Sequence, residues 1–67
     1  MKLQNNLKEI RLKKALTQEA LANMAGVTRQ TIIAIEKGKF VPSVKLALEL
    51  ANALNKPLES IFRLDDR

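Results

Sequence analysis

Apolar residues recur at helical spacing near the start of the chain, where Leu7 and Ile10 fall on one face of a short segment. Asn6, followed three residues later by Glu9, is typical of a capping box, in which two side chains satisfy backbone N–H groups at the start of a helix. This pattern predicts a helix over about residues 7–14.

The next two predicted helices are short and close together in the sequence. Thr17 is a favourable N-cap for a helix over about residues 18–25, and Thr28 is a favourable N-cap for a helix over about residues 29–37. Both helices are followed by a residue that takes the left-handed backbone conformation without strain, Gly26 and Gly38. Because so few residues join the two helices, we expect them to cross steeply.

The second half of the chain predicts a longer amphipathic helix and a short final one. Pro42 ends the preceding loop, and Ser43 caps a helix over about residues 44–54. The apolar stripe of this helix is predicted to contain Val44, Ala47, Leu48, Ala51 and Leu54. Pro57 stands at the favoured first position of a helix over about residues 57–62.

These elements predict an all-α bundle of five helices in one domain. The ends of the chain, about residues 1–4 and 62–64, alternate in part and could pair as a small two-stranded β ribbon. A chain of 67 residues buries only about 60% of the surface that its unfolded form exposes, so stability must come from efficient packing or from self-association.

The composition excludes several kinds of site. Cysteine and histidine are absent, which removes disulfides and the usual zinc ligands, and no metal or cofactor is expected. The same absence, in a domain with little room for a cleft, makes an enzyme an unfavoured reading, and no pocket for a small-molecule ligand is evident. No apolar stretch is long enough to span a membrane and no signal peptide is visible, so we expect a cytoplasmic protein without a membrane partner.

The net charge of +5 is regional. Residues 1–39 hold eight Lys or Arg and three Glu, whereas residues 40–67 hold equal numbers of basic and acidic side chains. A basic half is expected if that half faces a polyanion, but surplus lysine that only improves solubility explains the charge about equally well.

Residues 17–38, TQEALANMAGVTRQTIIAIEKG, strongly resemble the helix-turn-helix of the Cro/C1-type (XRE) family of prokaryotic and phage DNA-binding regulators. The likeness covers nearly the whole chain and is similar to that of short stand-alone members, although Pro57 replaces the Ser or Thr cap of many relatives. The resemblance implies a lambda-repressor-like fold and a nucleoid-associated transcriptional regulator. It also implies sequence-specific binding to double-stranded DNA, usually as a homodimer on a palindromic operator, and we expect a repressor.

The predicted helix over residues 29–37 has two separate faces. A projection at about 100° per residue places Ile32 and Ile35 on the face that packs against the bundle. The opposite face is free to enter a major groove, where Arg pairs with guanine, Gln pairs with adenine and an apolar side chain contacts the thymine methyl. The predicted base contacts are Arg29, Gln30, Ile33 and Ala34.

Contacts to DNA phosphates are predicted around this face. Gln18, at the first position of its helix, would direct its amide and the helix N-terminal N–H groups toward a phosphate. Each of the lysines could equally be a solubilising side chain. The complete predicted set is Gln18, Thr28, Thr31, Lys37, Lys39 and Lys45.

Glu36 lies between the buried face and the groove face, where an unpaired carboxylate would be desolvated and repelled by DNA phosphates. The matching positions of the Cro/C1-type family form an ion pair, so the resemblance implies that Arg11 pairs with Glu36. We expect this pair to be structural and to fix the orientation of the predicted recognition helix, residues 29–37.

A homodimer interface is expected in the neutral C-terminal half, because the basic half is committed to DNA. The apolar residues at this end exceed what one short helix can bury against its neighbour, and the interface is predicted to involve Leu58, Ile61, Phe62 and Leu64. Some of these side chains must also close the core of the subunit, so which of the four face the partner stays open. Two alternatives to a plain repressor remain open, an antitoxin that represses its own operon and a helical module that binds an acidic protein. The groove face lacks the aromatic and Met anchors of a protein-binding surface, which favours DNA.

Overall fold

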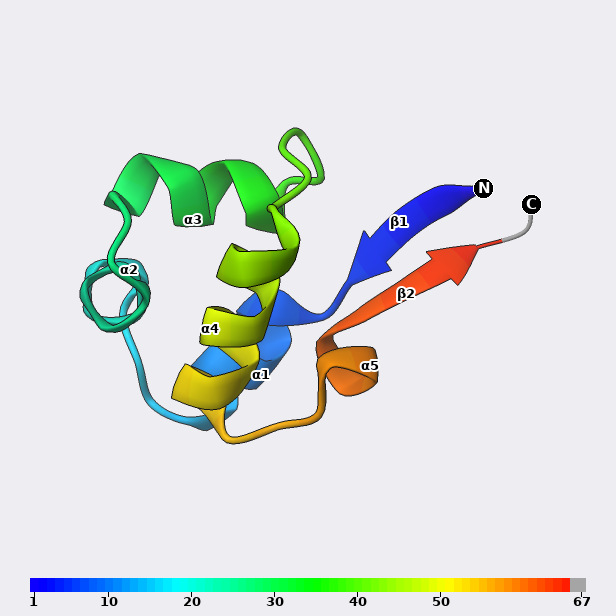
Figure 1. The fold of residues 1–67 in the computed structure, drawn as a ribbon. Helices are drawn as coiled ribbons and strands as arrows, with labels where there is room; N and C mark the ends of the chain where they lie inside the picture. The colour runs from blue at the N-terminus through cyan, green and yellow to red at the C-terminus, as the bar shows by residue number, and fades with distance from the viewer. Residues whose placement is uncertain (66–67) are drawn as a thin grey trace.

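The computed structural model describes residues 1–65 and contains a small ribbon and five helices (Figure 1). The elements in chain order are β1 (Lys2–Asn5), α1 (Leu7–Lys13), α2 (Gln18–Ala25), α3 (Arg29–Glu36), α4 (Val44–Leu54), α5 (Leu58–Ile61) and β2 (Phe62–Asp65). The predicted five-helix bundle with a ribbon from its two termini is confirmed. The last helix is shorter than predicted, because Pro57 is its N-cap and Phe62 already has extended backbone angles.

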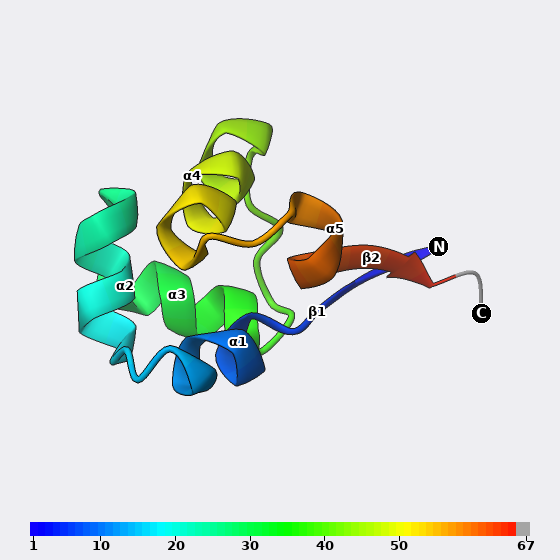
Figure 2. The same cartoon turned by 90° about the horizontal axis from the view of Figure 1, so that it is seen from below.

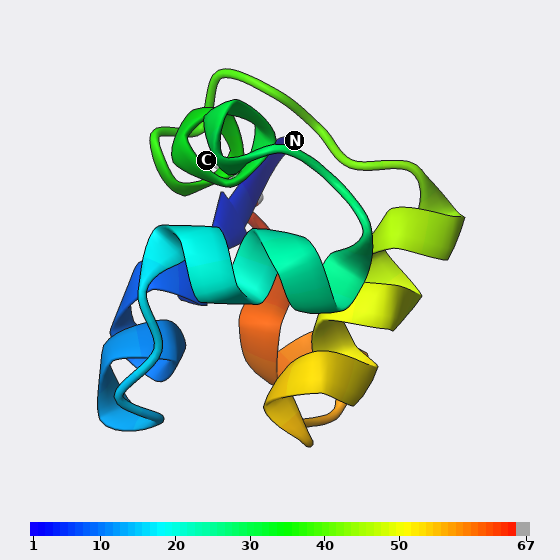
Figure 3. The same ribbon diagram turned by 90° about the vertical axis from the view of Figure 1, so that its left-hand side faces the viewer.

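The helices place α3 along one edge of the molecule, with α1 and the α4–α5 connection at the opposite edge (Figure 1). Seen from the side, α2 runs across the view while α3 is seen nearly end-on, so the two helices cross steeply as expected (Figure 3). The ribbon projects from the body on the side away from α2 (Figure 2).

The ribbon is antiparallel and joins the two ends of the described chain. Its opposed residues are Lys2 and Asp65, Leu3 and Leu64, Gln4 and Arg63, and Asn5 and Phe62. This pairing brings the N-terminal strand beside the C-terminal residues that were expected to form a dimer interface.

The core is formed by apolar residues of all five helices and of β2. The largest fully buried side chains are Leu7, Leu21, Ile32, Ile35, Leu50, Leu54 and Ile61. The predicted stripe of α4 is partly wrong, since Val44 is 75% exposed and Leu48 is 51% exposed, whereas Leu46 and Leu50 are buried. Apolar residues lie on more than one face of α4, and only one stripe of about 100° can face the bundle.

Most of the predicted helix boundaries are confirmed by their capping contacts. The hydroxyls of three N-cap residues accept hydrogen bonds from backbone N–H groups one turn on, at Thr17, Thr28 and Ser43. The predicted capping box at α1 is wrong, because the Asn6 side chain makes no cap bond. Asn5 takes this role instead, and its Oδ1 accepts from the Leu7 N–H at 3.1 Å.

Candidate nucleic-acid interface

The pair α2 and α3 is held in a helix-turn-helix by local features. Gly26 follows α2 with φ of 72°, a left-handed conformation that other residues adopt only with strain. The Thr28 hydroxyl then caps α3 by accepting from the Thr31 N–H at 3.3 Å. The turn between Ala25 and Arg29 is therefore short, and it holds α3 across α2.

One face of α3 is buried in the bundle and the other is open. Ile32 and Ile35 are 0% and 1% exposed and pack in the core. On the other side, Arg29, Gln30 and Lys37 are exposed, while Ile33 and Ala34 are half-buried between them. The four predicted base-contacting residues, Arg29, Gln30, Ile33 and Ala34, thus form one accessible strip of α3. The helix itself lies along an edge of the molecule (Figure 1).

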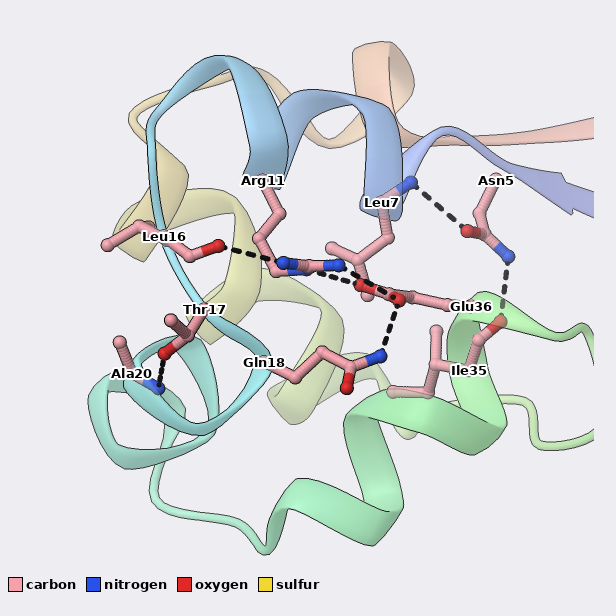
Figure 4. Close-up of polar contacts among 9 residues, drawn as sticks. All are labelled: Asn5, Leu7, Arg11, Leu16, Thr17, Gln18, Ala20, Ile35 and Glu36. Atoms are coloured by element: carbon pink, nitrogen blue, oxygen red, sulfur yellow. Dashed lines mark hydrogen bonds and ion pairs between the residues drawn. The ribbon is translucent and has the colours of Figure 1, made fainter.

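The C-terminal turn of α3 is fixed by a buried ion pair (Figure 4). Arg11 Nε donates to Glu36 Oε2 at 2.7 Å, and the two side chains are only 7% and 4% exposed. Arg11 Nη1 also donates to the Leu16 carbonyl at 2.8 Å, so the guanidinium links α1, the α1–α2 turn and α3. Such a pair orients a helix, because each buried charge is left uncompensated unless the other is in place.

Gln18 differs from the expectation that its amide would point to a phosphate. Its Nε2 donates to Glu36 Oε1 at 3.1 Å, and the side chain is half-buried (Figure 4). The amide is drawn inward because the Glu36 carboxylate has an acceptor oxygen facing the start of α2. In the structure the Gln18 amide thus faces Glu36, and the Ala20 N–H at the start of α2 is taken by the Thr17 hydroxyl, so a phosphate contact of Gln18 stays a prediction.

The other predicted phosphate contacts lie around the strip on α3. Lys37 and Lys39 are exposed just beyond its C-terminus. Lys45 is 88% exposed and pairs with Glu49 at 3.2 Å within α4. The hydroxyls of Thr28 and Thr31 lie 3.1 Å apart at the other end of α3.

The four residues expected at a dimer interface are in different environments. Leu64 is 63% exposed, Leu58 is half-buried and Phe62 is 9% exposed. Ile61 is 0% exposed, so of the four it is one that closes the subunit core and does not face a partner. The spacing of these residues in the sequence could not distinguish the buried from the exposed ones, because the helix ends at Ile61 and the backbone becomes extended at Phe62.

Beside Leu64 the surface has an apolar groove of about 270 Å³. It is lined by Leu3, Pro42, Val44, Ala47, Leu58, Glu59, Phe62, Arg63 and Leu64. Leu3 and Val44 were not assigned to this surface from the sequence. The signal for Leu3 was the expected pairing of the two termini, and the signal for Val44 was an apolar position outside the buried stripe of α4.

A sequence model of the helix-turn-helix family matches residues 7–61 of the chain, which includes all five helices. The chain belongs to the Cro/C1-type helix-turn-helix family. Two curated relatives are an HTH-type transcriptional regulator of Methanocaldococcus jannaschii, 52% identical over 64 residues, and the HTH-type transcriptional regulator YgzD of Bacillus subtilis, 44% identical over 64 residues. Each comparison covers 96% of this chain and 97% of the relative.

A solved structure with the same fold is the restriction-modification controller protein C.AhdI from Aeromonas hydrophila. It superposes with a TM-score of 0.77 at 35% identity, over 81% of this chain and 78% of that chain. Family membership makes this protein a DNA-binding transcriptional regulator and not an enzyme. Within residues 1–65, no helix is both long and apolar enough to cross a membrane.

Proposed function

We propose that this Cro/C1-type regulator is a repressor that binds a palindromic operator as a homodimer, with α3 in the major groove. The observation that carries the proposal is the accessible strip of α3, where Arg29 and Gln30 stand beside the half-buried Ile33. Arg and Gln are the side chains that form bidentate hydrogen bonds with guanine and adenine, and the isoleucine supplies an apolar contact for a thymine methyl. Ala34 completes the strip with a small side chain that leaves room in the major groove.

Phosphate contacts on both sides of the strip would hold α3 in register. Lys37 and Lys39 are placed beyond its C-terminus, and Lys45 near the start of α4. One subunit then makes about three cationic contacts, so a dimer makes about six, and the salt dependence of binding should have a slope near −5. Thr28 and Thr31 add hydroxyl contacts at the start of α3.

The dimer is proposed to form through the apolar groove beside Leu64. An exposed leucine on β2, next to Leu58, Leu3 and the exposed Val44, is apolar surface that a second copy would remove from water. A two-fold axis at this end leaves both α3 helices free and sets them about 34 Å apart, one turn of DNA. A dimer on the operator would exclude other proteins from that stretch of cytoplasmic DNA, which is the simplest mechanism of repression.

Selection of bound duplexes from a random DNA pool tests the operator directly. A palindrome is expected, and a motif without two-fold symmetry would contradict the dimeric proposal. On the selected operator, Arg29→Ala and Gln30→Ala should each relax base preference, with about 1–3 kcal/mol lost per bidentate contact. Lys39→Ala is the control and should weaken matched and mismatched duplexes alike. Equal losses on both duplexes for the Arg29 and Gln30 variants would refute the base contacts.

Sedimentation at micromolar concentration tests the dimer. Leu64→Glu should give folded monomers, because it places a charge in the apolar groove. Leu12→Glu is a matched control, since Leu12 on α1 is 57% exposed against 63% for Leu64 and does not line the groove. Ile61→Glu should unfold the subunit instead, since its side chain is fully buried. A wild-type chain that stays monomeric on the palindromic duplex would overturn this part of the proposal.

A further inference from the structure

Asn5 connects the ribbon to the recognition helix (Figure 4). Its Nδ2 donates to the Ile35 carbonyl in the last turn of α3 at 3.0 Å. Its Oδ1 accepts from the Leu7 N–H at the start of α1, so both ends of this half-buried amide are used. The bond to Ile35 joins residues that are 30 positions apart in the sequence.

The Ile35 carbonyl lies where α3 has few bonding partners of its own. The last carbonyls of a helix lack the N–H groups that a further turn would supply. Ile35 receives one bond from the Gly38 N–H at 2.9 Å, and Asn5 supplies a second one from outside the helix. At the next residue, Glu36 is held by Arg11, so two side chains of the N-terminal segment attach this turn to the bundle.

Asn5 also belongs to the ribbon that borders the apolar groove. Its Cα partner in β2 is Phe62, and the N–H of the following residue, Asn6, donates to the Ile61 carbonyl at 2.8 Å. Phe62 lines the groove together with Leu3 and Leu64. Asn5 therefore bonds directly to the C-terminal end of α3 and belongs to the strand whose Leu3 lines the surface proposed for dimerisation.

We infer that Asn5 is a positioning residue that fixes α3 relative to the dimer groove and thereby sets the half-site spacing that the dimer accepts. This inference rests on the proposed function, because spacing is defined only for two subunits. In a two-fold dimer, the component of a shift of α3 perpendicular to the axis has opposite senses in the two subunits, so it changes the separation of the recognition helices by twice its size. Arg11 ties α3 to α1 and to the α1–α2 turn, whereas Asn5 ties α3 to the ribbon, so the two side chains have different roles.

The test compares two variants of Asn5 with a neighbour. Asn5→Ser and Asn5→Asp each keep an oxygen that can accept from the Leu7 N–H, but both lose the Nδ2 donor to Ile35. Asn6→Ser is the matched control, because it removes a bond to the Ser60 carbonyl and one from Arg63 without touching α3. Affinities are measured on the selected palindrome and on the same half-sites with one base pair inserted at the centre.

Wild-type protein and Asn6→Ser should prefer the native spacing to the same degree. In both Asn5 variants affinity for the native spacing should fall about two- to tenfold, the size of one hydrogen bond, while affinity for the inserted duplex is nearly unchanged. A variant that is merely less stable would lose affinity on both duplexes equally. Hydrogen exchange in the free protein should also be faster at the Gly38 amide in the Asn5 variants.

An unchanged spacing preference in folded Asn5→Ser and Asn5→Asp would overturn the inference, as would the same loss in Asn6→Ser. If both Asn5 variants unfold while Asn6→Ser does not, the residue is structural and the inference also falls. A wild-type protein that binds no palindrome or shows no spacing preference would refute the proposed dimer first. These outcomes separate failure of the inference from failure of the proposed function.

Discussion

Removing one member of the Arg11–Glu36 pair should destabilise the protein more than removing both. In Arg11→Met the Glu36 carboxylate, 4% exposed, keeps only the Gln18 amide as a hydrogen-bond partner among those described. In Glu36→Met the guanidinium, 7% exposed, keeps the Leu16 carbonyl as its one hydrogen-bond acceptor within residues 1–65. A buried charge without its partner costs about 3–5 kcal/mol, which is a large part of the roughly 3–10 kcal/mol that stabilises a domain of this size.

The double variant removes both charges and leaves only neutral groups without their partners. The Leu16 carbonyl loses its bond to Arg11, at a cost of about 1–3 kcal/mol, while the half-buried Gln18 amide can turn to water. The two single losses together exceed the loss in the double variant, so the coupling energy between Arg11 and Glu36 should be at least about 3 kcal/mol, the upper end for residues in contact.

Urea denaturation followed by far-ultraviolet circular dichroism measures the free energy of unfolding of each variant, since the chain contains neither Trp nor Tyr. Trimethylamine N-oxide at constant concentration keeps the single variants folded enough to give a baseline. The Lys45–Glu49 pair is the control, because its side chains are 88% and 42% exposed at a similar separation of 3.2 Å. Its coupling should be only about 0.3–0.5 kcal/mol. Additive losses for Arg11 and Glu36, or coupling no larger than in the control, would refute the argument from burial.

Two further predictions concern the backbone and the helix caps. Gly26→Ala should destabilise the protein by about 1–2 kcal/mol, because φ is 72°. Apart from the adjacent residues, no described atom lies within 4 Å of the added Cβ, so the loss is conformational and not steric. Ala15→Gly should instead stabilise the protein, because Ala15 also has a positive φ, of 58°. A lower melting temperature for this variant would contradict the reasoning. Ser43→Ala should cost about 1 kcal/mol through loss of the bond from the Leu46 N–H, whereas Ser43→Gly should cost only a few tenths, and equal melting temperatures for the two would show that the cap is not responsible.

The accessible strip of α3 was predictable because it depends on one helix alone. Once a helix begins at Thr28, the period of about 3.6 residues places Ile32 and Ile35 on one side and Arg29 and Gln30 on the other. The Arg11–Glu36 contact came from the family resemblance, because its two residues are 25 positions apart and no local period relates them. The bonds of Gln18 and Asn5 to the end of α3 had no sequence signal of either kind.

The sequence by itself determined the family, the number of helices, most of their limits and the steep turn between α2 and α3. The helix limits and the turn arise from contacts within a few residues, such as the hydroxyl caps and the left-handed glycines, and such contacts can be predicted from the local sequence. The tertiary structure alone decided which apolar residues of α4 face inward and that Ile61 is buried while Leu64 is exposed. It also decided that the Gln18 amide turns to Glu36 and that Asn5 reaches Ile35. Each of these four features depends on how two elements that are distant in the sequence pack against each other. A side chain that could be either buried or exposed takes the environment that this packing provides.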